Sequence, residues 1–291
     1  MDSIEIKARA KINLSLDVLK KRPDGYHEVK MIMQTIDLCD RVIIDIVDGD
    51  IEVTSDSKWI PSGRDNIAYK AAKLIAEEFE ISKGVSIKIE KKIPVAAGLA
   101  GGSSDAAAVL NGMNQLFSLG LGENELMLLG KQIGADVPYC IKGGTMLAEG
   151  IGEILTELKQ MQEVNVVLVK PKIGVSTAWV YNNLELDKIM DRPDTDALIV
   201  AISNGRVDVL ARDMRNVLET VTVGKYGIIS EIKSKLVELG ALGSMMSGSG
   251  PTVFGIFEDI ATAQNAYEKI KCDRWECFLT KTADNINGMN P

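Results

Sequence analysis

The sequence predicts an α+β fold divided into two domains. In the first half, stretches of alternating apolar and polar residues lead into amphipathic helical stretches, and this pattern restarts near residue 160. The second half follows the β-α-β-β-α-β order of ferredoxin-like folds. With 291 residues, 46% apolar and 25% charged, the chain can build two ordinary cores. We therefore expect one domain over residues 1–160 and another over residues 161–291.

Each element follows from its periodicity. Period-two alternation predicts long strands over residues 5–19 and 26–47, which the turn residues Pro23-Asp24-Gly25 separate. Apolar residues at spacings of three and four predict helices. The remaining expected elements, in order, are a helix from Asp65, a strand over 85–93, helices after the glycine-rich segment and over 123–133, an apolar strand after Asp136, a hairpin over 143–152, a strand over 164–169, helices over 195–203, 206–221 and 226–239, strands over 242–247 and 252–257, a helix over 260–271 and a strand over 275–282.

The composition excludes several classes of protein. A net charge of −8 and the lack of long basic runs disfavour nucleic-acid binding. Four scattered cysteines and the single histidine His27 disfavour a zinc site and suit a reducing compartment. The N-terminal residues lack the basic and apolar regions of a signal peptide, so we expect none, and no apolar run approaches the roughly 18 residues needed to span a bilayer. We expect a cytoplasmic protein, a monomer or weak homodimer, that acts on a small molecule without nucleic acid or membrane.

The segment over residues 93–108 carries the clearest chemical signal. A strand enters it, glycines crowd the turn, Ser103 and Ser104 follow, and a helix leaves. Glycine backbone and the free N–H groups of a helix N-terminus together bind phosphate well. No Gly-Lys-Ser/Thr follows the glycines, so this is not a Walker A loop. On glycine content alone, a tight turn without a ligand remains an alternative.

The order of three motifs resembles that of the GHMP kinase family. The motifs are Ala10-Lys11-Ile12-Asn13-Leu14-Ser15-Leu16, Pro94-x-x-x-Gly98-Leu99-x-Gly101-Gly102-Ser103-Ser104-x-Ala106-Ala107, and Met246-Ser247-Gly248-Ser249-Gly250-Pro251. This resemblance implies the two-domain GHMP kinase fold, with an N-terminal ribosomal-protein-S5-like α/β domain and a C-terminal ferredoxin-like α/β domain. It also implies transfer of the ATP γ-phosphate to a small alcohol in the cleft between them.

A narrower resemblance concerns the acceptor. Residues 11–14, 22–27 and 134–138 are similar to the branch of the family that phosphorylates the 2-hydroxyl of cytidine-diphospho-methylerythritol, in non-mevalonate isoprenoid synthesis. Mevalonate- and galactose-type members carry Gly-Glu-His in the first motif, and this chain does not. Two alternatives stay open: another small-molecule kinase of the family, or a catalytically silent sensor with the same fold.

The resemblance assigns the catalytic roles to two residues. Asp136 is expected to be the base that accepts the proton of the substrate hydroxyl, and Lys11 the cation that assists it and orients the hydroxyl. Without the family, Asp136 could equally cap a local element. Lys11 would most often be a solvated side chain on a strand.

The cytidine end is expected to involve aromatic residues. The resemblance implies that Tyr26 stacks on the cytosine, that His27 hydrogen-bonds to its polar edge, and that Tyr181 covers the other face. A core tyrosine and a surface histidine are the ordinary alternatives. Residues expected to lie near the substrate or the reacting groups are also Asn13, Gly248 and Ser249, although the last two could belong to a plain hairpin.

The nucleotide end is assigned to the glycine-rich loop. The residues expected to wrap the phosphates are Pro94, Val95, Ala96, Ala97, Gly98, Leu99, Ala100, Gly101, Gly102, Ser103 and Ser104. Asn66 either meets the adenine or ribose or is a helix N-cap. Mg²⁺ is expected to arrive with ATP, with Ser104 as its protein ligand. Close relatives usually carry glycine where this chain has Ala100, and the loop should still form if residue 100 has φ < 0.

Overall fold

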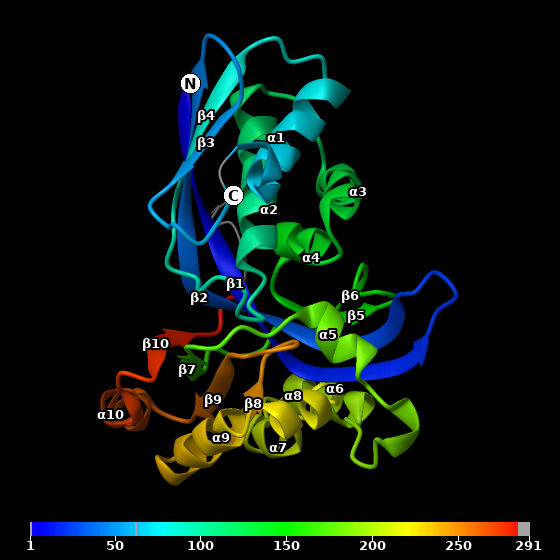
Figure 1. Cartoon of the computed structure of the whole chain (residues 1–291), viewed down its shortest axis with the longest axis vertical. Coiled ribbons are helices and arrows are strands. Elements are labelled where there is room, and N and C mark those ends of the chain that lie inside the picture. Colours follow the sequence, from blue (N-terminus) through cyan, green and yellow to red (C-terminus); the bar gives the residue numbers. More distant parts are fainter. Residues whose placement is uncertain (1, 62, 285–291) are drawn as a thin grey trace.

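The computed structural model describes residues 2–61 and 63–284, and Figure 1 shows its two domains one above the other. The first domain contains β1 (Ser3–Lys21), β2 (His27–Val47), β3 (Glu52–Ser55), the 3-10 turn η1 (Gly63–Asp65), α1 (Ile67–Glu78), β4 (Gly84–Glu90), α2 (Gly101–Leu116), α3 (Glu123–Ile133), α4 (Val137–Lys142), β5 (Thr145–Glu149) and β6 (Ile154–Glu157). The second contains β7 (Asn165–Pro171), α5 (Thr177–Asn182), η2 (Leu186–Lys188), α6 (Thr195–Ser203), α7 (Val207–Asp213), α8 (Glu219–Lys225), α9 (Ile228–Glu238), β8 (Gly243–Met246), β9 (Val253–Phe257), α10 (Ile260–Ile270) and β10 (Trp275–Lys281).

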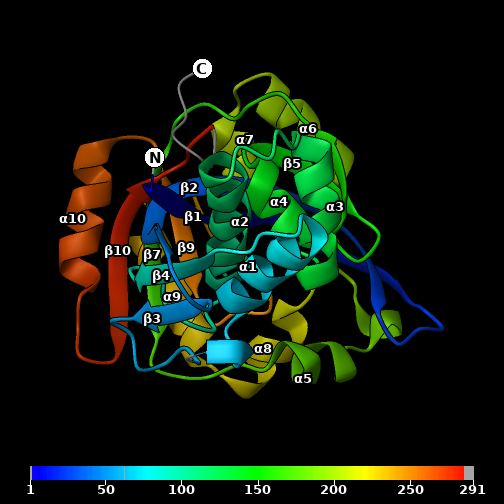
Figure 2. The ribbon, with the colours of Figure 1, turned by 90° about the horizontal axis from the view of Figure 1, so that it is seen from above.

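The first sheet has six strands in the order β3-β4-β2-β5-β6, and β1 pairs with β2. Only β3 and β4 run parallel; the other pairs are antiparallel. Figure 2 shows α1, α2, α3 and α4 gathered on one side of β1 to β4. The helix α2 is buried along nearly its whole length, because alanines and branched apolar residues cover several of its sides. It therefore forms the centre of this domain's core.

The long ribbon of β1 and β2 carries the first motif. Its register shifts between Arg9 and Lys11 and again between Asn13 and Ser15, so bulges flank the Lys11–Asn13 stretch. A bulge bends a strand and redirects its side chains, which is why bulges gather near functional sites. Lys11 and Asn13 lie two residues apart and share one face of the strand. Their side chains consequently meet.

The second sheet is antiparallel, with the order β10-β7-β9-β8. Since the chain order is β7, α9, β8, β9, α10, β10, this is the ferredoxin-like arrangement that the sequence predicts. Strand β9 is buried throughout, as its run Val-Phe-Gly-Ile-Phe suggests. Helices α5 to α8 are additions between β7 and α9, and Figure 1 shows α5 beside the ribbon of β1 and β2.

Most predicted elements are confirmed, and α6 has the predicted bounds. Two expectations are wrong. The helix predicted over 206–221 is interrupted between Asp213 and Glu219, because residues 215–217 hydrogen-bond to Leu16 of β1 instead. The segment after Asp136 is the helix α4 and not a strand, with Pro138 in its first turn, where a missing N–H costs nothing.

The two domains are joined by several contacts besides the chain itself. Leu16 N–H donates to the Arg215 carbonyl, and Val217 N–H donates to the Leu16 carbonyl. The Arg192 guanidinium also reaches the buried carboxylate of Asp17, at 2.5 Å. The boundary at residue 160 is not tested by these contacts and stays a prediction. Within residues 2–61 and 63–284, no helix is long and apolar enough to cross a membrane.

Candidate active site

A cavity of about 830 Å³ lies where the two domains meet. Both domains line it, and its walls come from β1, the glycine-rich loop, the start of α2, α5 and the loop after β8. The predicted residues that line it are Lys11, Asn13, Tyr26, His27, Asn66, Pro94, Val95, Ala96, Ala97, Gly98, Ala100, Gly101, Gly102, Ser103, Asp136, Tyr181, Gly248 and Ser249. Leu99 and Ser104 are predicted residues that do not line it; both are buried beneath the loop.

The glycine-rich loop is held from two sides. From the first domain, Lys11 N–H donates to the Leu99 carbonyl at 3.1 Å. From the second, the Ser247 hydroxyl donates to the Gly98 carbonyl at 2.9 Å. Gly98 has φ +75°, and a Cβ there would lie 2.2 Å from the Ser247 carbonyl oxygen. Glycine at this position is therefore required both by the backbone conformation and by the close approach of the second domain.

Ala100 does not have the negative φ under which the loop was expected to form. Its φ is +58°, in the left-handed region, and Ala96 is also left-handed at +51°. An L-residue pays roughly 1–2 kcal/mol there. The surrounding hydrogen bonds hold it: Ser104 N–H and the Ser104 hydroxyl both donate to the Ala100 carbonyl, at 2.9 and 3.1 Å. The loop thus keeps the shape that glycine would favour, although it carries alanine.

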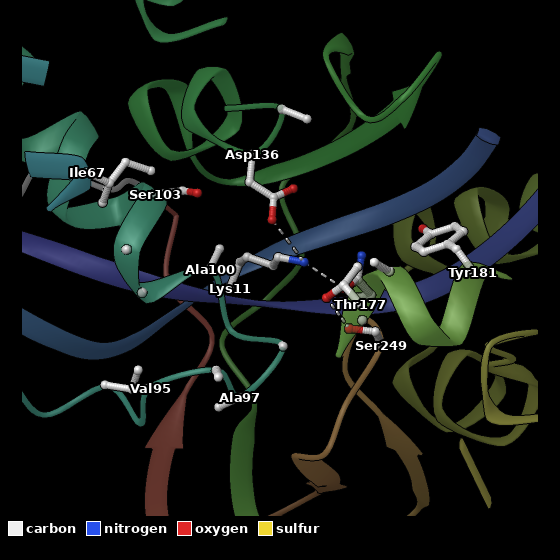
Figure 3. A pocket seen from close by; sticks show the side chains of 18 of the residues that line it. Lys11, Ile67, Val95, Ala97, Ala100, Ser103, Asp136, Thr177, Tyr181 and Ser249 are labelled. Carbon is white, nitrogen blue, oxygen red and sulfur yellow. Dashed lines mark hydrogen bonds and ion pairs between the residues drawn. The ribbon is translucent and has the colours of Figure 1, made fainter. Parts of the chain in front are cut away.

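The two serines after the glycines have different environments. The Ser104 hydroxyl is buried and donates to the Arg9 carbonyl at 2.7 Å, besides its bond to Ala100. This bond turns it away from the cavity, which argues against the predicted Ser104–Mg²⁺ contact. Ser103 lines the cavity instead, and Figure 3 shows its hydroxyl on the first turn of α2.

Lys11 and Asp136 meet at the middle of the cavity. The Lys11 ammonium lies 3.9 Å from Asp136 Oδ2 and donates to Asn13 Oδ1 at 2.8 Å. The Lys11 side chain is 6% exposed, and that of Asp136 is 34% exposed. The ammonium is therefore fixed from two sides, while the carboxylate is open to the cavity (Figure 3).

Asp136 does not act as a capping side chain. It occupies the N-cap position of α4, yet its carboxylate accepts no capping hydrogen bond from that helix. The capping alternative is therefore excluded, and the carboxylate remains available for chemistry. Helix α3 ends before Gly134, whose extended backbone leads the chain to this position.

A pair of hydroxyl groups faces Lys11 from the second domain. Thr177, at the start of α5, lies 2.8 Å from Ser249 in the loop after β8, oxygen to oxygen. Figure 3 shows both side chains next to the Lys11 ammonium. Ser249 was expected here, but the sequence analysis missed Thr177. Its position directly after the capping residue Ser176, at the start of a helix, was the only local signal.

The predicted cytidine residues lie together at one end of the cavity. The rings of His27 and Tyr181 are 5.1 Å apart and tilted by 36°. Tyr26 is 60% exposed at the rim. Partial burial, with Lys21 nearby, lowers the pKa of His27, so the neutral ring is favoured. Tyr26, His27 and Tyr181 all line this end of the cavity, and their contact with a base stays a prediction.

Asn66 is the N-cap of α1. Its side-chain oxygen accepts from Ala68 N–H at 2.8 Å, and its side-chain nitrogen donates to the Pro61 carbonyl at 2.8 Å. The capping interpretation is therefore confirmed. Asn66 also lines the cavity, and its contact with adenine or ribose stays a prediction.

A buried charge cluster that no sequence motif predicted lies behind the loop. The Lys91 ammonium lies between the carboxylates of Asp40 and Asp105, at 2.5 and 2.7 Å. Burial, reinforced by Asp40 and opposed by Lys91, raises the pKa of Asp105 to about 8. Two carboxylates and one ammonium would carry a net charge of −1 in the interior, so a proton on Asp105 neutralises the cluster. Lys91 and Asp105 also line the cavity.

The described part of the chain contains no cluster of side chains that is ready to bind a metal ion. Residues 2–61 and 63–284 contain no group of three or more His, Cys, Asp or Glu residues placed to hold a metal ion. The cysteines Cys39, Cys140, Cys272 and Cys277 are all free.

Family models match both halves of the chain. The GHMP kinases N terminal domain matches residues 66–144, and the GHMP kinases C terminal model matches residues 198–277. The 4-diphosphocytidyl-2-C-methyl-D-erythritol kinase of Acetivibrio thermocellus is 63% identical over 282 residues, which cover 97% of this chain and 100% of that protein. The enzyme of the same name from Alkaliphilus oremlandii is 54% identical and covers 97% of each chain.

Solved structures share the fold. A crystal structure of a 4-(cytidine 5′-diphospho)-2C-methyl-D-erythritol kinase matches with a TM-score of 0.85 at 32% identity, covering 97% of this chain and 100% of that one. A homoserine kinase from Cytophaga hutchinsonii matches with a TM-score of 0.78 at 20% identity, covering 99% and 96%. The two-domain fold that the motifs predict is therefore confirmed.

Proposed function

The chain belongs to the GHMP kinase family, and we propose that it transfers the γ-phosphate of ATP to the 2-hydroxyl of 4-diphosphocytidyl-2-C-methyl-D-erythritol. Membership makes it an ATP-dependent small-molecule kinase. The observation that supports the specific substrate is the order of groups along the cavity. The glycine-rich loop lies at one side, Lys11 and Asp136 in the middle, and Tyr181 at the other side (Figure 3).

Asp136 is the proposed base. Its carboxylate is open to the cavity and is not used in capping, so it can accept the proton of the substrate hydroxyl. The ammonium of Lys11, 3.9 Å away, would hold the hydroxyl beside that carboxylate and face the transferring phosphoryl group. Such transfers depend mainly on positioning and on stabilising charge.

The phosphates are proposed to bind at the glycine-rich loop and the N-terminus of α2. Gly101 and Gly102 line the cavity and are the first residues of α2, where backbone N–H groups have no carbonyl partner within the helix and can bind an anion. Mg²⁺ bound to ATP would neutralise phosphate charge. Ser103, which lines the cavity, replaces Ser104 as the proposed protein contact for it.

The cytosine is proposed to bind between Tyr26 and Tyr181, with His27 reading its polar edge. The contact between the His27 and Tyr181 rings leaves no room for a base between these two. The exposed Tyr26 can cover the face of the cytosine that points away from Tyr181 without disturbing the core. The cytoplasmic location and the domain boundary at residue 160 stay predictions.

The substrate is tested by measuring ADP release with the cytidine-diphospho substrate, mevalonate and homoserine in parallel. We expect turnover with the first alone. Turnover with mevalonate or homoserine but not with the cytidine compound would assign the chain to another member of the family. ATP binding without turnover of any of them would favour the sensor alternative.

The base is tested by Asp136→Asn. We expect kcat to fall by about 10²–10⁴-fold while ATP still binds, because a general base contributes about that much. The matched control is Asp273→Asn, an exposed aspartate before β10, which should leave kcat unchanged. If Asp136→Asn retains more than about a tenth of the wild-type kcat, Asp136 is not the base.

A further inference from the structure

We infer that Asn216 is a positioning residue for phosphoryl transfer, which together with Glu219 holds the loop Ser247–Gly250 against the cavity. This inference rests on the proposed function, because it concerns how the same site is assembled. We call Ser247–Gly250 the closing loop. Asn216 lies in the interruption between α7 and α8 and does not touch the cavity that holds Lys11.

The closing loop follows directly after β8, an edge strand that pairs with another strand on one side only. Strand β8 is last in the order β10-β7-β9-β8. Ser247 N–H donates to the Thr252 carbonyl across the hairpin, so the backbone of Met246, one residue earlier, points to the opposite, unpaired side. An edge of this kind presents backbone N–H and C=O groups that have no strand partner and can bond to other groups.

Asn216 and Glu219 bond to that free edge. The Asn216 side-chain nitrogen donates to the carbonyls of Met246 and Gly248, both at 2.8 Å. Glu219 Oε1 accepts from Met246 N–H at 2.7 Å, and Lys233 lies 2.5 Å from Glu219 Oε2. Two side chains thus replace the missing strand.

Asn216 itself is held rigidly. It is 5% exposed, and its side-chain oxygen accepts from Leu218 N–H at 3.0 Å. Its neighbours Arg215 and Val217 hydrogen-bond to Leu16 of β1, the strand that carries Lys11. Asn216 therefore fixes the position of the closing loop relative to β1, the strand that carries Lys11.

The closing loop in turn contacts the groups at the centre of the reaction. Ser247 donates to the Gly98 carbonyl of the glycine-rich loop. Ser249 pairs with Thr177, and both line the cavity together with Lys11. A displacement of the closing loop would therefore move the phosphate side of the cavity relative to Lys11. His27, on β2, lies outside the loop, and Tyr181, on α5, is linked to it through the Thr177–Ser249 pair at the start of that helix.

The test is Asn216→Asp, which keeps the shape and the acceptor for Leu218 but replaces the donor with an oxygen facing two carbonyls. We expect kcat to fall about 10- to 100-fold, since a misplacement of about 1 Å can cost this much. The Kd for the cytidine substrate should stay within about twofold of wild type. Asn204→Asp, at an exposed asparagine after α6, is the matched control and should change neither.

A second measurement separates positioning from general destabilisation. Amide hydrogen exchange of the free protein should become faster at residues 246–250 in Asn216→Asp and stay unchanged in β9. Glu219→Gln, which keeps an acceptor for Met246 N–H, should retain most of kcat, whereas Glu219→Met should behave like Asn216→Asp.

Two results would overturn the inference. One is faster exchange at residues 246–250 with kcat unchanged, because the loop would then be free without consequence. The other is a loss of kcat accompanied by equal losses of cytidine binding and of protection in β9, because Asn216 would then only support the fold. Failure of the proposed function shows differently, as absence of turnover in the wild-type protein, and the exchange experiment needs no substrate.

Discussion

The contact between the glycine-rich loop and the closing loop makes Gly98→Ala a severe substitution. Gly98 has φ +75°, and a Cβ there would lie 2.2 Å from the Ser247 carbonyl oxygen. That oxygen belongs to the backbone and cannot rotate away. The substitution must therefore separate the two loops as well as strain residue 98.

The expected loss of stability has two parts. The left-handed backbone costs an L-residue roughly 1–2 kcal/mol. Separating the loops breaks the Ser247–Gly98 hydrogen bond and weakens that between Thr252 N–H and the Ala97 carbonyl, at 2.9 and 3.4 Å, which together contribute about 1–2 kcal/mol. The free energy of unfolding should therefore fall by about 3 kcal/mol, which for a chain of 291 residues corresponds to roughly 5 °C in Tm.

The assay compares Gly98→Ala with Gly120→Ala by calorimetry and by KM for ATP. Gly120 has φ +71°, but a Cβ there would meet nothing within 4 Å. The control therefore carries the backbone cost alone, about 1–2 kcal/mol, and should leave the KM for ATP unchanged. Gly98→Ala should raise the KM for ATP about tenfold or more, because the phosphate-binding backbone moves.

Equal losses of Tm in the two variants, with an unchanged KM for ATP in Gly98→Ala, would refute this reasoning. The two loops would then separate without cost, and the contact between the glycine-rich loop and the closing loop would have no role in binding ATP. A loss of Tm that is larger in Gly98→Ala than in Gly120→Ala would confirm that the steric contact adds to the cost of the backbone angle.

Two further predictions concern pH. Burial lowers the pKa of His27 below its usual 6.5, so the ring that we propose reads cytosine is neutral at pH 7. The KM for the cytidine substrate should rise only as the pH falls below that lowered value, and His27→Gln should remove this rise without affecting the KM for ATP. The pKa of Asp105 is raised to about 8 in the folded protein. Between pH 3.8 and about 8 the folded protein therefore binds more protons than the unfolded chain, so the free energy of unfolding falls as the pH rises through this window. Asp105→Asn cannot ionise, so its Tm relative to wild type should increase with pH; parallel Tm profiles would contradict the raised pKa.

Periodicity predicted the elements well because most of them bury one face. The alternation over residues 5–19 and 26–47 corresponds to β1 and β2, and the helix over 195–203 is found with those bounds. The interruption between α7 and α8 could not be predicted in this way. Residues 214–218 continue an apolar helical pattern, but hydrogen bonds to Leu16, some 200 residues earlier, override it.

The site was predicted only where its residues lie in contiguous motifs. Lys11, Asp136, His27 and most of the glycine-rich loop line the cavity. The cluster of Lys91, Asp40 and Asp105 was missed, because only the folded chain brings these three together.

Local preference also misled in two places. Alanine disfavours positive φ, yet Ala100 is held there by bonds to its carbonyl. Ser104 follows the glycines directly, but the helical turn directs its hydroxyl to Arg9. In both cases, contacts with neighbouring segments decide the geometry.

The pairing of Leu16 with residues 215–217 has a consequence for synthesis of the protein on the ribosome. Strand β1 is made first, but the segment that bonds to Leu16, and the closing loop that Asn216 holds, emerge after more than two thirds of the chain. The hydrogen bond from Ala283 N–H to the carbonyl of Thr35 in β2 forms later still, because Ala283 is synthesised near the end. A nascent chain therefore carries Lys11 and the glycine-rich loop long before the second wall of the cavity exists, and the site is completed only near the end of translation.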